Sequence, residues 1–446
     1  MGDAASDRRL HGTTDRAVKG RYLPPAVAAT LIAAAALTGA VVYARQLERR
    51  YVHTLGSTNF PQKTLGIALQ AEAFRQPDLL PIYGSSEILR HTQYHAGRVF
   101  RYYPTGFTVF PVAMAGASPL MFVARIAAIG STIRGRKIVI SVVPSNLYQS
   151  RRSDVYAGNF SRLQATALAF SLDLPFRLKR SAARRLLDYP ETLERDPLLR
   201  MALQLLADGS AKSRAFYGLL FPLGKLQELV LAIQDHWENL TLDAKILTQE
   251  NRQTKVFREF DWQSLAAQAE GISEQHASNN PFGFDNRVWT RYSRQLMRPR
   301  GGEGKTVQSV RRMLSSLASH PGLNWADLDL LLDELNALGA EPLIMAAPFK
   351  GPYLDYWGVS PQSRQVYFET LRAMGARHGV PVVDFADHDQ DRYFVVDTLS
   401  HISEKAWVYY DRVLDDFYHS RLSTAGTAVR PGPAQADEVL VTSAKP

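Results

Sequence analysis

The sequence has 446 residues, of which 46% are hydrophobic and 21% are charged, and it contains no cysteine. This composition supports a sizeable core in one large domain with an insertion, or in two domains, and it excludes disulfides and thiolate metal sites. The formal net charge of +9 favours an anionic neighbourhood, such as lipid headgroups or a phosphate-rich polymer. We find no groove-reading element and expect no nucleic-acid partner.

An uncharged apolar segment at residues 24–44 is long enough to cross a bilayer, which takes about 20 residues. Five Lys or Arg residues precede it and three follow it closely. This excess predicts that residues 1–23 stay in the cytoplasm and that everything after residue 44 lies on the outer side of the cell membrane. A cleaved signal peptide and a buried Ala-rich helix are the alternatives, and the long leading segment favours a retained single-pass anchor.

Strand-like and helix-like segments alternate in residues 79–150, after a connecting segment at residues 45–78. Three apolar runs have the composition of strands in a buried sheet, namely residues 80–83, 107–112 and 137–143. A serine followed by proline opens a helix at residue 119. This part of the chain is predicted to form the first half of an α/β domain.

The alternation stops in residues 151–320, which carry almost no strand signal and several amphipathic helices. One of these helices places five apolar residues on one face: Leu226, Leu229, Val230, Ile233 and Trp237. We interpret this segment as a helical insertion. Residues 321–422 then form the second half of the α/β domain, with strands at 342–347 and 380–385, and residues 423–446 have the composition of a disordered tail.

Helix–strand alternation on both sides of the insertion predicts one doubly wound parallel sheet with right-handed crossovers. In such sheets, ligands bind outside the carboxyl ends of the strands. We therefore expect functional residues in the loops that follow the strands, at residues 84–87, 113–118, 144–148 and 349–357 and after the fifth strand.

Asp397 and His401 lie four residues apart in the segment after the fifth predicted strand. A carboxylate that holds one ring nitrogen of a histidine lets the other nitrogen take a proton from a serine nucleophile. Ser85 and Ser86, where the first strand turns into a helix, supply such hydroxyls. The alternatives are a helix N-cap for the serines and a solvated Asp–His pair at the start of the last helix.

Two backbone N–H groups could stabilise an oxyanion at this edge, those of Ser86 and Gly116. Gly116 could equally serve a turn that needs a positive φ. Ser145 and Asn146 follow the third strand and could add a side-chain donor, although a plain turn after the preceding proline is the preferred interpretation.

Other chemistries lack their sequence signatures. No glycine-rich nucleotide-binding motif follows the first strand, and the aspartates around His388 are typical of a solvated loop. We therefore expect neither a cofactor nor a metal ion.

Four motifs now combine into a family pattern: GSSEIL at residues 84–89, AGNFSRLQA at 157–165, YLDYWGVS at 353–360 and DTLSHISEKAW at 397–407. Together they resemble the DltD family, membrane-anchored proteins of the systems that attach D-alanine to teichoic acids, with a fold similar to that of SGNH hydrolases. The resemblance runs from about residue 78 to about residue 420. It implies an SGNH- or flavodoxin-like sheet behind a single transmembrane helix.

The resemblance also implies a Ser–His–Asp site, with Ser86 as the nucleophile and His401 as the base. The family acid precedes the histidine by three residues, where this chain has Thr398, whereas Asp397 precedes it by four. Asp384 or Asp355 could substitute for Asp397 in principle. The YLDYWGVS motif suggests a substrate loop with Tyr353 and Asp355, and Ser145 stands where the family has glutamine.

The function implied is that of an extracytoplasmic serine acyltransferase, which passes an acyl group, D-alanyl by resemblance, to hydroxyls of an anionic cell-envelope polymer. The implied partners are a multispanning MBOAT-type membrane acyltransferase and a cytoplasmic D-alanyl carrier protein. Two alternatives stay open: an esterase or thioesterase that releases acyl groups to water, and a non-catalytic scaffold for the acyltransferase and its carrier.

Overall fold

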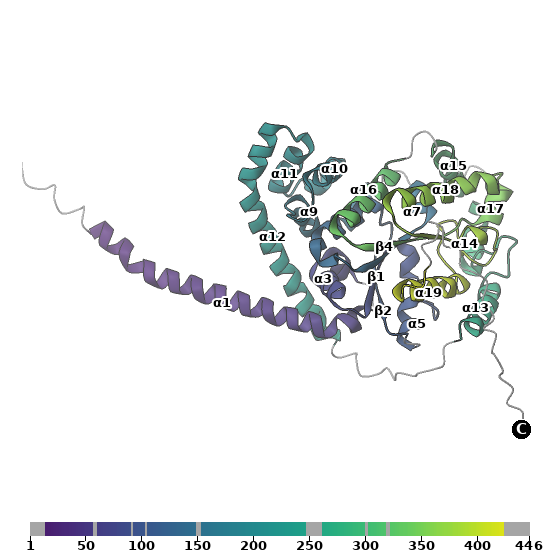
Figure 1. Cartoon of the computed structure of the whole chain (residues 1–446), viewed down its shortest axis with the longest axis horizontal. Helices are drawn as coiled ribbons and strands as arrows, with labels where there is room; N and C mark the ends of the chain where they lie inside the picture. The colour runs from purple at the N-terminus through teal and green to yellow at the C-terminus, as the bar shows by residue number, and fades with distance from the viewer. Residues whose placement is uncertain are drawn as a thin grey trace, which may run out of the picture.

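The computed structural model describes residues 14–56, 60–90, 92–102, 105–148, 153–246, 261–298, 302–317 and 322–422. Over these ranges the chain forms an α/β domain from which one long N-terminal helix extends (Figure 1). The predicted disordered tail and the first residues of the predicted cytoplasmic segment lie outside the described residues.

The domain is built on five parallel strands: β1 (Leu79–Gly84), β2 (Thr108–Ala113), β3 (Lys137–Val142), β4 (Glu341–Ala346) and β5 (Val382–Asp384). Their order in the sheet is β2-β1-β3-β4-β5, the flavodoxin-like order. Nearly every strand residue is buried, because helices cover both faces. The predicted fold class is therefore confirmed.

The two faces of the sheet are covered by different helices. Helices α6 (Pro119–Ile129), α16 (Leu323–Leu338) and α18 (Pro361–His378) pack in one core with strand residues such as Tyr83 and Ile140. Helices α5 (Ala96–Tyr102) and α19 (Glu404–Tyr418) pack on the other face, where Phe100 and Trp407 join Ile82 and Val139. Because helices cover both faces of the sheet, a site is expected in the loops at the carboxyl ends of the strands.

The segment between β3 and β4 forms helices and no strand among its described residues. After α7 (Pro144–Tyr148), it contains α8 (Ser153–Asn159), α9 (Arg162–Ala169), α10 (Phe176–Leu186), α11 (Pro197–Asp208), α12 (Ala211–Ile246), α13 (Trp262–His276), α14 (Asn286–Leu296) and α15 (Gly302–Ser316). Helices α9 to α12 lie on the side of the domain nearest the N-terminal helix, whereas α13 to α15 lie on the opposite side (Figure 1).

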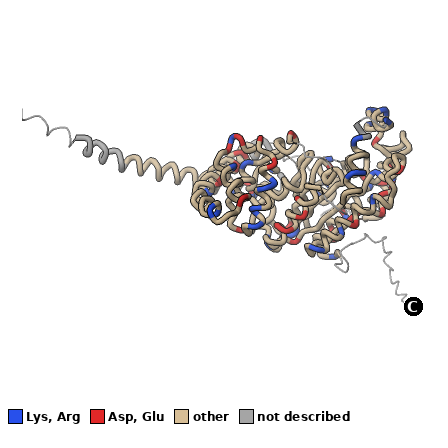
Figure 2. Tube along the Cα trace, turned by 90° about the horizontal axis from the view of Figure 1, so that it is seen from above, with Lys and Arg blue, Asp and Glu red and all other residues tan. Residues whose placement is uncertain are grey.

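The N-terminal helix α1 (Thr14–Gly56) contains the predicted apolar segment and continues beyond it into the domain. Residues 25–40 are exposed, and Figure 2 shows this part of the helix leaving the domain without charged residues. Within Pro25–Thr54, a window of 18 residues has a mean hydropathy of 2.0, and the helix is long enough to span a membrane, which fits an anchor or a signal sequence. This helix is therefore a candidate membrane anchor.

The predicted connecting segment is itself largely helical. Helix α1 packs on the domain through Ala44, Glu48, Tyr51 and Val52, which recur at helical spacing and are buried. Helices α2 (Pro61–Leu65) and α3 (Ala68–Arg75) follow before β1 begins. Helix α1 and the domain are thus joined by a packed contact rather than by a loose linker.

Candidate active site

Ser86 lies at the carboxyl edge of the sheet, where β1 is flanked by β2 and β3. It is the first residue of the short helix α4 (Ser86–Leu89), two residues after the end of β1, and it is half-buried. The chain leaves β1 in one direction towards β2 and returns on the other side as β3. Ligands of doubly wound sheets bind at such a reversal of strand order, so Ser86 occupies the position favoured for a site.

Close packing at Gly84 fixes this turn. A Cβ atom at Gly84 would lie 2.4 Å from Ile88 Cγ1 and 2.6 Å from Glu87 Oε1. We expect Gly84→Ala to destabilise the protein by about 1–3 kcal/mol, as overpacking does, and to displace Ser86. Thermal unfolding checks this against Gly158→Ala, because a Cβ at Gly158 meets nothing within 4 Å. Equal melting temperatures for the two variants would contradict the argument.

The structure brings together Ser86, His401 and Asp397. The Ser86 Oγ atom lies 2.7 Å from His401 Nε2, and His401 Nδ1 lies 2.5 Å from Asp397 Oδ2. This is the arrangement in which a serine hydroxyl can lose its proton to a histidine that a carboxylate orients. Two segments far apart in the sequence thus form one hydrogen-bonded unit.

A tight hairpin accommodates the four-residue spacing between Asp397 and His401. The Val396 N–H group donates to the His401 carbonyl oxygen at 2.8 Å, and Asp397 Oδ1 accepts the N–H groups of Leu399 and His401 at 3.0 and 3.2 Å. The chain reverses at Ser400, which has a left-handed φ of 62°. The additional residue in this loop therefore leaves Asp397 in contact with the histidine.

The two alternative carboxylates are engaged elsewhere. Asp384 Oδ2 pairs with Arg372 Nε at 2.7 Å, and Asp355 Oδ1 pairs with Arg364 Nη1 at 2.7 Å. Both aspartates neutralise buried or half-buried guanidinium groups, so Asp397 is the carboxylate that the structure places on His401.

The pair Asp397–His401 has mutually shifted pKa values. Burial disfavours the imidazolium of His401, but the hydrogen bond and the negative charge of Asp397 outweigh it, so the pKa of His401 is raised. Burial likewise disfavours the carboxylate of Asp397, yet its bonds to His401 hold the pKa of Asp397 below its ordinary value. Asp397 is therefore charged at neutral pH and stabilises a positive charge on His401.

These shifts predict the pH dependence of any proton transfer from Ser86. Only neutral His401 can accept the proton, so the rate must fall as the pH drops through the raised pKa of His401. We expect the rate to fall on the acid side with a midpoint above 6.5, the ordinary pKa of histidine. Acylation by an activated ester, followed between about pH 5 and about pH 8, checks this, and a midpoint at or below the ordinary value would contradict it.

Glu87 is a site residue that sequence reasoning missed. Its carboxylate is fully buried and accepts the Ser85 N–H group at Oε1, at 2.8 Å, while burial raises the pKa of Glu87. Ser85 occupies the N-cap position of α4 but forms no cap hydrogen bond through its side chain. The turn is therefore shaped by Glu87 and by the Ser85 backbone. Its position directly after the two serines is the sequence signal that could have identified Glu87 as a site residue.

Gly116 lies at the same edge as Ser86, because Ala113 at the end of β2 pairs in register with Gly84 at the end of β1. Its φ is +74°, and a Cβ atom there would lie 2.4 Å from Val155 Cγ1. Glycine is thus required by conformation and by space, as the turn interpretation expects.

The residues after β3 hold the loop from Asp397 to His401, hereafter the histidine loop. Ser145 Oγ donates to the Leu399 carbonyl oxygen at 3.1 Å, and the Tyr148 hydroxyl donates to the Thr398 carbonyl oxygen at 3.3 Å. Asn146 forms backbone hydrogen bonds within its turn and to Asn324. The Ser145 hydroxyl, a candidate donor on sequence grounds, is therefore used in a loop contact, and Tyr148 is a further support that the sequence did not reveal.

The predicted substrate loop contributes packing. Tyr353 has no exposed surface and donates its hydroxyl hydrogen to the Leu296 carbonyl oxygen at 2.9 Å, so it is a core residue rather than a substrate contact. Lys350, which sequence reasoning missed, is buried and donates to the carbonyl oxygens of Gly283, Arg392 and Val395. Burial lowers the pKa of Lys350 to about 7. This side chain supports the segment that leads into the histidine loop.

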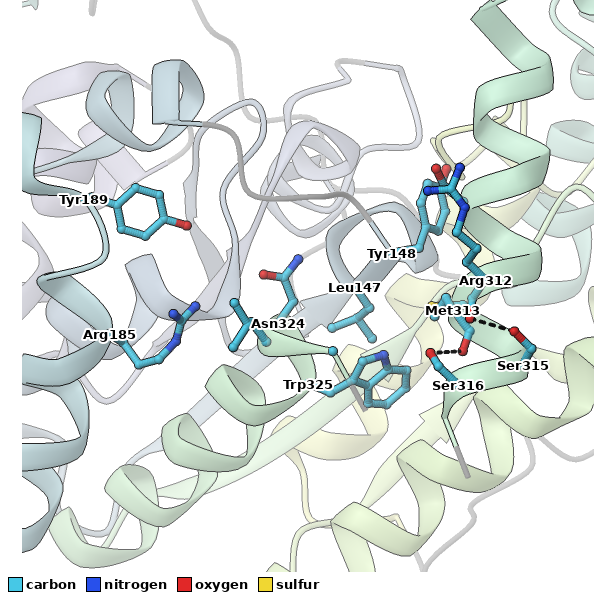
Figure 3. Close-up of a pocket in the computed structure, with 13 residues that line it drawn as sticks. Leu147, Tyr148, Arg185, Tyr189, Arg312, Met313, Ser315, Ser316, Asn324 and Trp325 are labelled. Carbon is cyan, nitrogen blue, oxygen red and sulfur yellow. Dashed lines mark hydrogen bonds between the residues drawn. The ribbon is translucent and has the colours of Figure 1, made fainter. Parts of the chain in front are cut away.

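A cavity of about 540 Å³ opens beside the site, between α7, α15 and α16 (Figure 3). Its walls include Tyr148, Arg312 and Trp325, but Ser86 and His401 do not line it. Tyr148 contacts both the cavity and the histidine loop. Over the ranges that the structure describes, no group of three or more His, Asp or Glu side chains could hold a metal ion.

Comparisons with known proteins identify the family of this chain. The family model described as DltD protein matches residues 57–419. Protein DltD of Bacillus subtilis (strain 168) is 28% identical over 411 residues, which cover 90% of this chain and 98% of that protein. Protein DltD of Staphylococcus aureus is 21% identical over 347 residues, covering 78% of this chain and 82% of that protein. The family match spans the sheet, the insertion and the histidine loop, and this chain belongs to the DltD family.

Proposed function

We propose that the protein is a serine acyltransferase in which Ser86 carries the acyl group as an ester. The observation that carries this proposal is the 2.7 Å contact between Ser86 Oγ and His401 Nε2, with Asp397 on the other ring nitrogen. A hydrogen-bonded unit of this kind supports a catalytic protein over a scaffold, because a scaffold needs no aligned proton acceptor.

The chemistry runs in two steps. His401 Nε2 takes the Ser86 proton as Oγ bonds to the acyl carbon, and it passes this proton to the leaving group as the old acyl bond breaks. An acceptor hydroxyl then attacks the ester, His401 takes its proton, and Ser86 Oγ receives that proton as the ester bond breaks. The N–H groups of Ser86 and Gly116 are our candidates for stabilising the oxyanion in both steps.

Proteins of the DltD family take part in the D-alanylation of teichoic acids, so D-alanyl is our candidate acyl group and a hydroxylated, anionic envelope polymer our candidate acceptor. The uncharged apolar segment of α1 supports attachment to the cell membrane, and the excess of Lys and Arg before it supports a domain on the outer side. By the same analogy, we propose an MBOAT-type acyltransferase and a D-alanyl carrier protein as partners.

The partition of an acyl-Ser86 ester tests this function against the esterase alternative. The full chain is loaded with isotope-labelled D-alanine from an activated ester, and the label is followed with and without purified teichoic acid. We expect the label to move to the polymer faster than to water. Release to water at the same rate with and without polymer would identify an esterase instead.

A further inference from the structure

Helix α12 carries a stripe of exposed apolar side chains, hereafter the α12 stripe. Its six members are Phe216, Leu219, Leu223, Leu226, Val230 and Trp237, and each is between 50% and 73% exposed. They recur every three or four residues with one gap of seven, so they lie on one face of the helix. A continuous stripe of this length on a protein surface marks a contact with an apolar partner.

The opposite face of α12 belongs to the domain. The Tyr217 hydroxyl donates to the Ala169 carbonyl oxygen at 2.6 Å, and Gly224 lies against the ring of Phe170, where a Cβ would clash. Asp235 is buried and accepts the N–H groups of Ile67 and Ala68 at 2.8 Å. A helix held this way along its length can lie on a bilayer but cannot cross one, although its apolarity alone fits a span.

The carboxyl-terminal part of α12 is attached to α1 just beyond the apolar segment. Glu48 accepts hydrogen bonds from His236 Nδ1 at 2.9 Å and from Asn239 Nδ2 at 2.8 Å, four residues after the apolar segment ends. From this junction α12 diverges from α1 and runs along the side of the domain from which α1 leaves (Figure 1). If α1 crosses a membrane, the stripe therefore begins at the membrane surface.

Basic side chains flank the stripe at both ends. Lys212 and Arg214 are exposed at its amino-terminal end. Arg45 and Arg49 are exposed on α1 at the other end, where they line a cavity of about 600 Å³ between α1, α3 and α12. Helices that lie in a membrane surface combine such an apolar face with Lys and Arg near lipid phosphates.

We propose that the α12 stripe lies in the surface of the membrane that α1 crosses, with its apolar side chains among the lipid tails and the flanking basic residues at the headgroups. The proposal rests on α1 being a retained anchor, as the proposed function has it. Interfacial helices bury their apolar face by about 5–10 Å. This second attachment restricts rotation of the domain about α1 and gives the site a constant orientation to the membrane.

The lack of native cysteine allows a direct test with single labels on the full chain. Leu226→Cys reports on the stripe, Leu31→Cys on the exposed part of α1, and Gln263→Cys on an exposed position of α13 at the far side of the domain. Each variant receives a polarity-sensitive fluorophore and is reconstituted into protein-free vesicles of phosphatidylcholine and phosphatidylglycerol with brominated acyl chains. We expect quenching at positions 31 and 226 to exceed that at position 263 by about threefold or more, because only buried labels meet the bromines.

Quenching at position 31 without quenching at position 226 would overturn the proposal and leave the anchor intact. A label at position 226 that is protected only in native membranes would overturn it as well, because a partner protein would then cover the stripe. Quenching at neither position would refute the anchor and with it the membrane contact. None of these outcomes bears on the chemistry of Ser86, which is measured separately with an activated ester.

Discussion

Ser86→Ala is expected to abolish formation of an acyl-enzyme and to lower the rate of acyl transfer by about 10⁴-fold or more, because the nucleophile is removed. The hydroxyl of Ser86 is the group that lies 2.7 Å from His401 Nε2, and alanine has no atom to which an acyl group could bond. The measurement is the burst of alcohol released when the protein reacts with an activated ester. The fold should be unaffected, since Ser86 is half-buried and at the start of a short helix.

Ser85→Ala is the matched control for Ser86→Ala, one residue away on the same turn. Glu87 holds the backbone N–H group of Ser85, which alanine keeps, and the Ser85 side chain makes no cap hydrogen bond. We expect the burst to persist, with a loss below about tenfold. A burst that survives in Ser86→Ala but disappears in Ser85→Ala would reverse the assignment of the nucleophile.

Asp397→Asn is expected to lower the acylation rate by about 10³- to 10⁴-fold while leaving the hairpin in place. The side-chain amide can donate a hydrogen bond to His401 Nδ1, which favours the tautomer that is protonated at Nε2 and cannot accept the Ser86 proton. The asparagine carbonyl oxygen can still accept the N–H groups of Leu399 and His401. The loss therefore measures the charge and tautomer control that Asp397 supplies.

Asp384→Asn separates this effect from a general loss of carboxylates. Asp384 pairs with Arg372 on α18, away from His401, and we expect its variant to keep the acylation rate within about tenfold of wild type. A rate for Asp397→Asn close to that of Asp384→Asn would show that His401 does not depend on Asp397. The melting temperature of each variant is the control for folding.

The sheet could be predicted from local sequence because its signals are local. Each strand except β2 is a short apolar run ended by glycine, proline or a polar residue, and each predicted strand overlaps the observed one, as residues 137–143 do with β3 (Lys137–Val142). The meeting of Ser86 with His401 followed from topology, since the carboxyl ends of parallel strands share one edge. The family resemblance implied their pairing, but the geometry of the hydrogen bond could not be predicted, because it depends on the hairpin in which Ser400 has a left-handed φ.

The supporting residues could not be assigned because their roles depend on partners distant in sequence. Ser145 could be read as a donor or as part of a plain turn, and its hydroxyl in fact donates a hydrogen bond to the Leu399 carbonyl oxygen, more than 250 residues later. Tyr353 looked like a substrate contact and is buried in the core. Lys350 gave no sequence signal at all, since a lysine is ordinarily exposed and here it binds three carbonyl oxygens.

The central claim, an acyl ester on Ser86, is tested most directly by mass spectrometry of the protein after brief reaction with an acyl donor in the absence of acceptor. We predict one acyl group on the tryptic peptide that contains residues 76–90, localised by fragmentation to Ser86, removed by hydroxylamine and absent from Ser86→Ala. An acyl group on another residue, or continued transfer to the acceptor by Ser86→Ala at the wild-type rate, would contradict the account.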